Sequence, residues 1–145
     1  MRICIDIDGT LCPIRRDDES YQSLPPYRAM VDELTRLRGE GYWIILMSSR
    51  NMNTFDGNVG EINAHTLRPL LDWLDRHGVP FDEVHVGKPW AGRIGFYVDD
   101  RAIRPDEFLA HGIAELDALV ESGRKRLEEL EARHNGAAGA NADAK

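Results

Sequence analysis

The chain has 145 residues, a length that fits one domain with a sizeable core. It carries 18 Lys and Arg against 25 Asp and Glu, so its formal net charge is −7. An acidic chain is a poor binder of nucleic acid or of an anionic membrane surface. Its longest strongly apolar run, residues 43–47, is far too short to span a bilayer, and no signal peptide precedes the first strand. We therefore expect a cytoplasmic protein without a membrane or nucleic-acid partner.

The chain contains two cysteines, Cys4 and Cys12. Two cysteines make no disulfide framework, which suits a reducing compartment. Cys4 lies within an apolar run and is predicted to be a buried small hydrophobe. Cys12 is interpreted as a packing residue rather than a reactive thiol.

Hydrophobic periodicity predicts strands that alternate with helices. We expect strands at residues 2–6, 42–47, 79–86 and 94–98. We expect helices at 27–40, 61–76 and 113–133, with a short turn or helix starting at 104. The polar stretch 11–26 has neither periodicity and is interpreted as a substrate-facing flap loop. The predicted organisation is a single domain over 1–134, followed by a disordered tail over 135–145.

This alternation indicates an α/β fold with a parallel, Rossmann-like sheet flanked by helices. In such sheets, ligands bind beyond the carboxyl ends of the strands. We call that end of the sheet the carboxyl edge. The strands predicted here end in chemically active side chains, which are Asp6, Asp8, Ser48, Lys88, Asp99 and Asp100. The sequence therefore predicts that these residues meet at the carboxyl edge.

The segment Asp6-Ile7-Asp8-Gly9-Thr10 is the most specific of these strand ends. Residues two apart on a strand share a face, so the two carboxylates are expected to converge. At about 5 Å and an effective dielectric of about 20, their repulsion is about 3 kcal/mol. A hard divalent cation with oxygen ligands, Mg²⁺ first, is expected to offset it. Asp6 is a candidate nucleophile toward phosphorus and Asp8 a candidate general acid and base.

Other side chains at the predicted edge suit a bound phosphate. Lys88 and Ser48 are expected to hold phosphate oxygens, with Thr10 and Ser49 as further hydroxyl donors. Arg50, Asn51 and Arg101 are candidate substrate contacts. For Arg50 and Arg101 an ion pair with an acid of the carboxyl edge is an equal alternative, and for Asn51 a turn role is the stronger one.

Taken in order, the four strand ends resemble the four motifs of the haloacid dehalogenase (HAD) superfamily, over roughly residues 1–108. The resemblance implies a HAD-like core and Mg²⁺-dependent phosphoryl transfer through an aspartyl-phosphate on Asp6. It implies that Asp8 moves the proton and gives a backbone carbonyl to the metal. It also implies metal ligation by Asp6 and by Asp99, with Asp100 adjacent. An acid at position 8 favours phosphatase over dehalogenase chemistry.

Four longer stretches sharpen the resemblance. Small HAD phosphatases linked to capsular polysaccharide biosynthesis have stretches similar to residues 49–52, 57–60, 87–90 (Gly87-Lys88-Pro89-Trp90) and 97–105. That resemblance implies a phosphorylated sugar or polyol as substrate, a small phosphorylated metabolite. No gap between motifs is large enough for a cap domain, so the site is expected to be capless and open.

Two rival functions are retained. The first is a phosphatase of a nucleotide or macromolecular phosphate, which an open site would admit. The second is a non-catalytic module, either a phospho-accepting receiver or an inactive scaffold. The helix predicted over 113–133 has partial heptad spacing at Val120, Leu127 and Leu130, broken by Gly123. This spacing leaves two alternatives, a homodimer seam or, favoured, a helix packed on its own domain.

Overall fold

The computed structural model describes residues 1–142, and the side chains of residues 1–134. The chain forms two compact units, Met1–Gly95 and Phe96–Lys145. None of the helices among the described residues is long and apolar enough to cross a bilayer.

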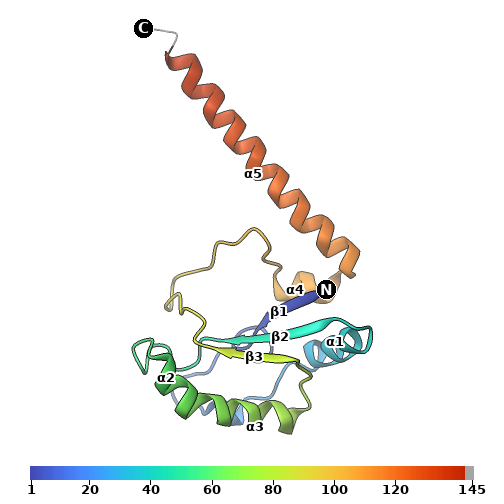
Figure 1. Ribbon diagram of the computed structural model, residues 1–145, viewed down its shortest axis with the longest axis vertical. Coiled ribbons are helices and arrows are strands. Elements are labelled where there is room, and N and C mark those ends of the chain that lie inside the picture. Colours follow the sequence, from blue (N-terminus) through green and yellow to red (C-terminus); the bar gives the residue numbers. More distant parts are fainter. Residues whose placement is uncertain (143–145) are drawn as a thin grey trace. The chain divides into compact units, whose positions relative to one another are not determined.

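The first unit is built around a parallel sheet of three strands in the order β1-β2-β3. They are β1 (Arg2–Asp6), β2 (Trp43–Ser48) and β3 (Glu83–Val86). In the register, Asp6 lies beside Met47, and Ser48 lies beside Val86. Figure 1 shows the strands side by side, with α2 near their carboxyl ends. The expected α/β class with a parallel sheet is confirmed for this unit.

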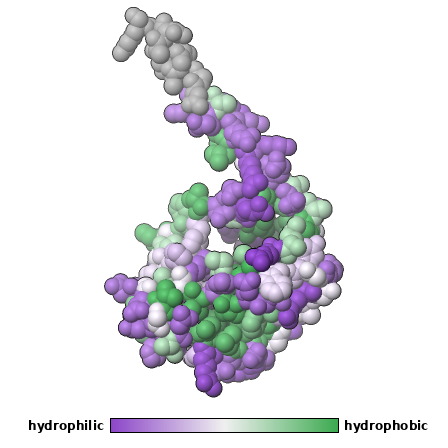
Figure 2. All heavy atoms as spheres, in the orientation of Figure 1, coloured by the Kyte–Doolittle hydropathy of each residue, from purple (hydrophilic) through white to green (hydrophobic). Residues whose placement is uncertain are grey.

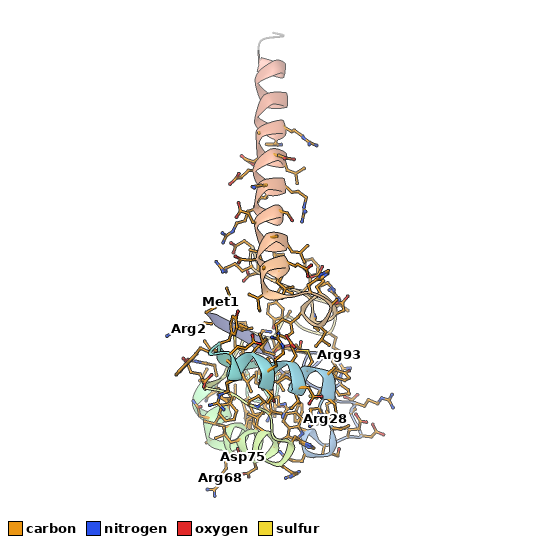
Figure 3. All side chains as sticks on the ribbon, turned by 90° about the vertical axis from the view of Figure 1, so that its right-hand side faces the viewer. Met1, Arg2, Arg28, Arg68, Asp75 and Arg93 are labelled. Carbon is orange, nitrogen blue, oxygen red and sulfur yellow. The ribbon has the colours of Figure 1, made fainter. Side chains whose placement is uncertain are left out.

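Helices connect the strands. The helix α1 (Arg28–Gly39) joins β1 to β2, and its buried residues Met30, Leu34 and Leu37 have the spacing expected of one helix face. Between β2 and β3 run α2 (Val59–Ile62), the π-helical segment η2 (Asn63–Leu67) and α3 (Arg68–His77). Charged residues of these helices, such as Arg28 and Asp75, point outward (Figure 3).

The core of the first unit lies on the sheet face that carries Ile5, Ile44 and Leu46, all of them buried. Both crossovers proceed in the same direction along the sheet, and right-handed crossovers place their helices on one face. Residues alternate between faces, so Cys4 points to the other face. Cys4 is exposed, and the prediction that it is buried is wrong. The reason is its position on an edge strand, on the face opposite Ile5.

The loop over residues 11–26 is fastened to α3. It contains the short 3₁₀ helix η1 (Tyr21–Ser23). The indole Nε1 of Trp73 donates a 2.8 Å hydrogen bond to the carbonyl of Leu24, and Gln22 donates one of 2.7 Å to the carbonyl of Pro69. This loop is therefore a fixed wall of the first unit.

The second unit contains α4 (Pro105–Ala110) and α5 (Ile113–Ala142). The helix expected near 104 is confirmed. Helix α5 continues past residue 133 into the region expected to be a disordered tail, and residues 143–145 lie outside the described residues. Its surface in Figure 2 is mainly hydrophilic, with separate hydrophobic residues. Among these, Leu127 and Leu130 are exposed.

The strand predicted over 94–98 is wrong: these residues form no strand in the structure. Ile94, Phe96 and Val98 are 98%, 81% and 90% exposed. Apolar, β-branched residues favour a strand, but a strand exists only where a neighbour completes its hydrogen bonds. The segment crosses the boundary between the two units at Gly95.

Candidate functional site

Asp6 and Lys88 meet at the carboxyl edge of the sheet. Asp6 is the last residue of β1, and Lys88 follows β3 by two residues. The ammonium Nζ of Lys88 lies 3.0 Å from Oδ1 of Asp6. The backbone N–H of Lys88 also donates a 3.0 Å hydrogen bond to the carbonyl of Ser48, at the end of β2. Residues from three strand ends are thus brought together, as the sequence predicts.

Asp8 is presented by a tight turn. The N–H groups of Thr10, Leu11 and Cys12 all donate to the carbonyl of Ile7, at 3.2, 2.8 and 3.1 Å. Gly9 has a φ of +87°, in the left-handed region that an L side chain rarely adopts. The backbone therefore forms a tight hydrogen-bonded turn directly after β1, and this turn holds Asp8 in place. The side chain of Asp8 is 18% exposed.

The carboxylate of Asp8 is bound by Arg50. The guanidinium donates from Nε to both carboxylate oxygens, at 3.1 and 3.0 Å, and from Nη2 to Oδ1 at 3.0 Å. The side chain of Arg50 is only 1% exposed. Of the two roles that the sequence left open for Arg50, the structure has the ion pair. A side chain so buried and so fully engaged does not reach out to a substrate.

Each acid of the pair therefore has its own cation from the chain. The repulsion of about 3 kcal/mol expected between two close carboxylates is offset by Lys88 at Asp6 and by Arg50 at Asp8. Long-range ion pairs of this kind cannot be read from a local motif, because the cations lie 82 and 42 residues away in the sequence.

Cys12 lies against the same ion pair. Its Sγ is 3.6 Å from Oδ1 of Asp8 and 3.6 Å from Nη2 of Arg50. Burial, and next the negative charge of Asp8, raise the pKa of the Cys12 thiol to about 12. A thiol that stays protonated is a poor nucleophile, so the structure favours the packing role.

The hydroxyl residues differ in access. Ser48 is fully buried, and its Oγ accepts the N–H of Arg50 at 3.1 Å, which leaves the hydroxyl proton to donate elsewhere. Thr10 and Ser49 are half-buried. Asn51 has a φ of +61° and donates a 2.8 Å hydrogen bond to Oγ1 of Thr66, in the π-helical segment. Asn51 thus holds its own loop, which is the turn role that the sequence favoured.

Asp99, Asp100 and Arg101 belong to the second unit. Oδ1 of Asp99 accepts the backbone N–H of Arg101 at 2.7 Å, while the side chain of Arg101 is exposed. Oδ2 of Asp100 accepts two hydrogen bonds from Arg124, at 2.6 and 3.0 Å, and these lower the pKa of Asp100. Both acids line a depression with Leu119 and Arg124. Since Arg124 occupies Asp100, Asp99 is the acid of this pair better suited to bind a cation.

The donor chemistry at the carboxyl edge fits a magnesium ion in part. Among the described residues, no group of three or more His, Cys, Asp or Glu side chains is gathered for a metal. Mg²⁺ needs less than that, since it keeps waters and commonly takes only one or two carboxylates with substrate phosphate. Asp6, with a side chain 30% exposed, is open to such an ion. The carboxylate of Asp8 is not, because Arg50 binds it, so Asp8 could offer only its backbone carbonyl.

Sequence reasoning missed two residues next to the site. The rings of Tyr21 and Trp73 lie under the guanidinium of Arg50, with their centroids 4.5 and 5.3 Å from its central carbon. The available indications were an aromatic residue in an otherwise polar loop and a tryptophan on the buried face of α3. Neither observation identifies Arg50 as the contact, because the fold is needed to bring these residues together.

Comparison with solved structures shows a relative of this chain. The architecture places the chain among α/β proteins with a Rossmann-like parallel sheet. The crystal structure of a target protein from Vibrio cholerae superposes with a TM-score of 0.78 and 43% sequence identity, over 83% of this chain and 97% of that one. The chain therefore belongs to the same family as this Vibrio cholerae protein. No family model matches the chain, and no curated protein matches it.

Proposed function

We propose that this protein is a Mg²⁺-dependent phosphatase that hydrolyses phosphomonoesters through an aspartyl-phosphate on Asp6. The observation that carries the proposal is the cluster at the carboxyl edge: Asp6 lies 3.0 Å from Lys88, and the backbone of Lys88 is bonded to Ser48. A carboxylate nucleophile, an ammonium group and a buried hydroxyl are the parts that phosphoryl transfer requires. The HAD resemblance of the same residues supports the choice.

The chemistry follows from the roles of two acids. An oxygen of Asp6 forms a bond to phosphorus while the bond from phosphorus to the leaving oxygen breaks, and Asp8 gives its proton to that oxygen. Water then attacks the same phosphorus and passes a proton to Asp8 as the bond between Asp6 and phosphorus breaks. Lys88 and Ser48 hold the phosphoryl oxygens, with Thr10 and Ser49 nearby in the sequence to assist.

A magnesium ion would be held, within the first unit, by the carboxylate of Asp6 and by the backbone carbonyl of Asp8. When bound, it supplies positive charge that stabilises the phosphoryl oxygens. Within the second unit, the HAD resemblance makes Asp99 the candidate metal ligand of the pair Asp99 and Asp100, because Arg124 already engages Asp100.

We propose a phosphorylated sugar or polyol as the substrate, in the synthesis of capsular or surface polysaccharide precursors. This choice is supported by the similarity of residues 49–52, 57–60, 87–90 and 97–105 to the phosphatases of that group. The short loops between the motifs support an open site without a cap domain.

Release of inorganic phosphate from a panel of sugar and polyol phosphates tests the proposal. Wild-type protein with Mg²⁺ is expected to turn over, and excess chelator is expected to abolish turnover. Asp6→Asn should lose activity by at least a thousandfold, while the control Asp32→Asn, on the exposed surface of α1, should keep it. Activity retained in Asp6→Asn would refute the nucleophile, and activity retained in chelator would refute the metal.

A further inference from the structure

Arg50 is a charged residue buried where its only carboxylate partner among the described residues is Asp8. Burying an ion pair costs several kcal/mol per ion, which attraction and hydrogen bonds repay only with good geometry. A pair of apolar residues would serve stability at that place as well or better. Stability alone therefore does not explain a buried guanidinium beside Asp8, and we looked for its role in the proton transfer proposed for Asp8.

The guanidinium is held firmly in position. Aromatic rings of Tyr21, in the loop, and Trp73, in α3, lie against it at 4.5 and 5.3 Å. Cation–π contacts of this kind gain strength when the cation is desolvated. Trp73 is itself fixed by its hydrogen bond to Leu24, so two separate elements determine where Arg50 lies. A planar guanidinium held in one position in turn holds the carboxylate that it binds in one position.

The two oxygens of Asp8 are engaged unequally. Within the described part of the chain, Oδ1 takes hydrogen bonds from Nε and Nη2 of Arg50 and the contact from Cys12, whereas Oδ2 takes only the one from Nε. Oδ1 is thus the anchored oxygen and Oδ2 the one with lone pairs to spare.

We infer that Arg50 is a positioning residue for the proton transfer by Asp8, which it anchors through Oδ1 so that Oδ2 exchanges the proton with the leaving oxygen and then with water. The inference rests on the proposed phosphatase function. Oδ1 accepts hydrogen bonds whether Oδ2 carries a proton or not, so the anchor persists through both steps. Arg50 acts through Asp8 and does not contact the substrate.

The test compares two classes of substrate. A nitrophenolate ion leaves without a proton, whereas an alkoxide needs one, so misplacing the proton donor must slow alkyl phosphates more than p-nitrophenyl phosphate. General acid catalysis contributes about 10²- to 10⁴-fold. For Arg50→Met we expect kcat/KM, which covers only the steps up to release of the leaving group, to fall about 100-fold with glycerol phosphate and less than 10-fold with p-nitrophenyl phosphate. Hydrolysis of the aspartyl-phosphate is common to both substrates and does not enter this comparison.

Two further variants serve as controls for the comparison between the two substrates. Arg50→Lys keeps the positive charge but not the planar guanidinium, and should lose about 10-fold in kcat/KM with the alkyl phosphate. The control Arg36→Met removes an exposed arginine from its ion pairs with Glu33 and Glu40, and should change neither rate. If Arg50→Met does not fold, as judged by circular dichroism, the substrate ratio of Arg50→Lys decides alone.

A double mutant shows whether Arg50 acts through Asp8. In an Asp8→Asn background, Arg50→Lys should cost less than twofold, because the group that it positions is gone. An unchanged ratio between the two substrates in the Arg50 variants would overturn the inference while leaving the phosphatase function intact. A wild-type protein inactive on every phosphomonoester would instead overturn the proposed function, and the inference with it.

Discussion

Replacing Trp73 by phenylalanine should loosen the loop over residues 11–26 from α3. Trp73 is fully buried, and its Nε1 donates the 2.8 Å hydrogen bond to the carbonyl of Leu24. Phenylalanine has no donor, so that carbonyl loses its partner at a cost of about 1–3 kcal/mol. Roughly 40 Å³ of ring volume is removed as well, which at about 24 cal/mol per Å³ adds about 1 kcal/mol. The expected loss of unfolding free energy is about 2–4 kcal/mol.

Trp90 provides a matched control, because it is 45% exposed and the same substitution there should cost less than about 0.5 kcal/mol. All three tryptophans lie in the first unit, so denaturant unfolding followed by fluorescence reports on that unit in both variants. Limited proteolysis with trypsin adds a local readout, since Arg15 and Arg16 lie in the loop. Equal stability losses in Trp73→Phe and Trp90→Phe, with equal cleavage, would refute the reasoning.

Two further predictions concern a thiol and a turn. With iodoacetamide at pH 8, exposed Cys4 should be alkylated and Cys12 spared until the chain is denatured, as mass spectrometry of the native protein can check; equal labelling would contradict the burial of Cys12. The pKa of Cys12 rises from 9.0 to about 12 on folding, so its contribution to stability is present below pH 9 and is lost as the pH rises toward 12. Gly87→Ala should destabilise by about 1–3 kcal/mol in thermal unfolding, because φ is +83° and the added carbon would meet a valine methyl at 3.1 Å. Gly39→Ala, in helix α1 with open space around it, should be stabilising by comparison, and the reverse order would contradict the argument.

Local patterns predicted the elements of the first unit well. The strand over 2–6 and the helix near 27–40 match β1 and α1 closely, because apolar spacing and turn residues lie within one short window. The helix predicted over 61–76 exists but contains the π-helical turn at Asn63–Leu67. A π-helical turn holds one more residue than an α-helical turn, and a hydrophobic pattern does not show this difference. In the structure, Thr66 of this turn accepts the hydrogen bond from Asn51.

Contacts between residues far apart in the sequence could be predicted only in part. The sequence placed Lys88 at the same edge as Asp6, since parallel strand ends meet there, and the 3.0 Å contact agrees with that expectation. It could not choose between the two roles of Arg50, because a buried ion pair depends on the rings of Tyr21 and Trp73 that enclose it. The strand predicted over 94–98 failed for a related reason: strand formation depends on a pairing partner, which the segment itself does not encode.

The fastening of the loop to α3 also ties the site to the local stability of that helix. Gln22 bonds to Pro69, Trp73 to Leu24 and Arg76 to the Gln22 carbonyl across 47, 49 and 54 residues of sequence. All three bonds exist only while α3 is docked, because Pro69, Trp73 and Arg76 belong to that helix. Arg50 meets Asp8 across 42 residues and relies on the same two elements. Local opening of α3 would therefore take the ring of Trp73 away from Arg50, and with it part of the support for Asp8, while β1 and β2 remain paired through their own backbones.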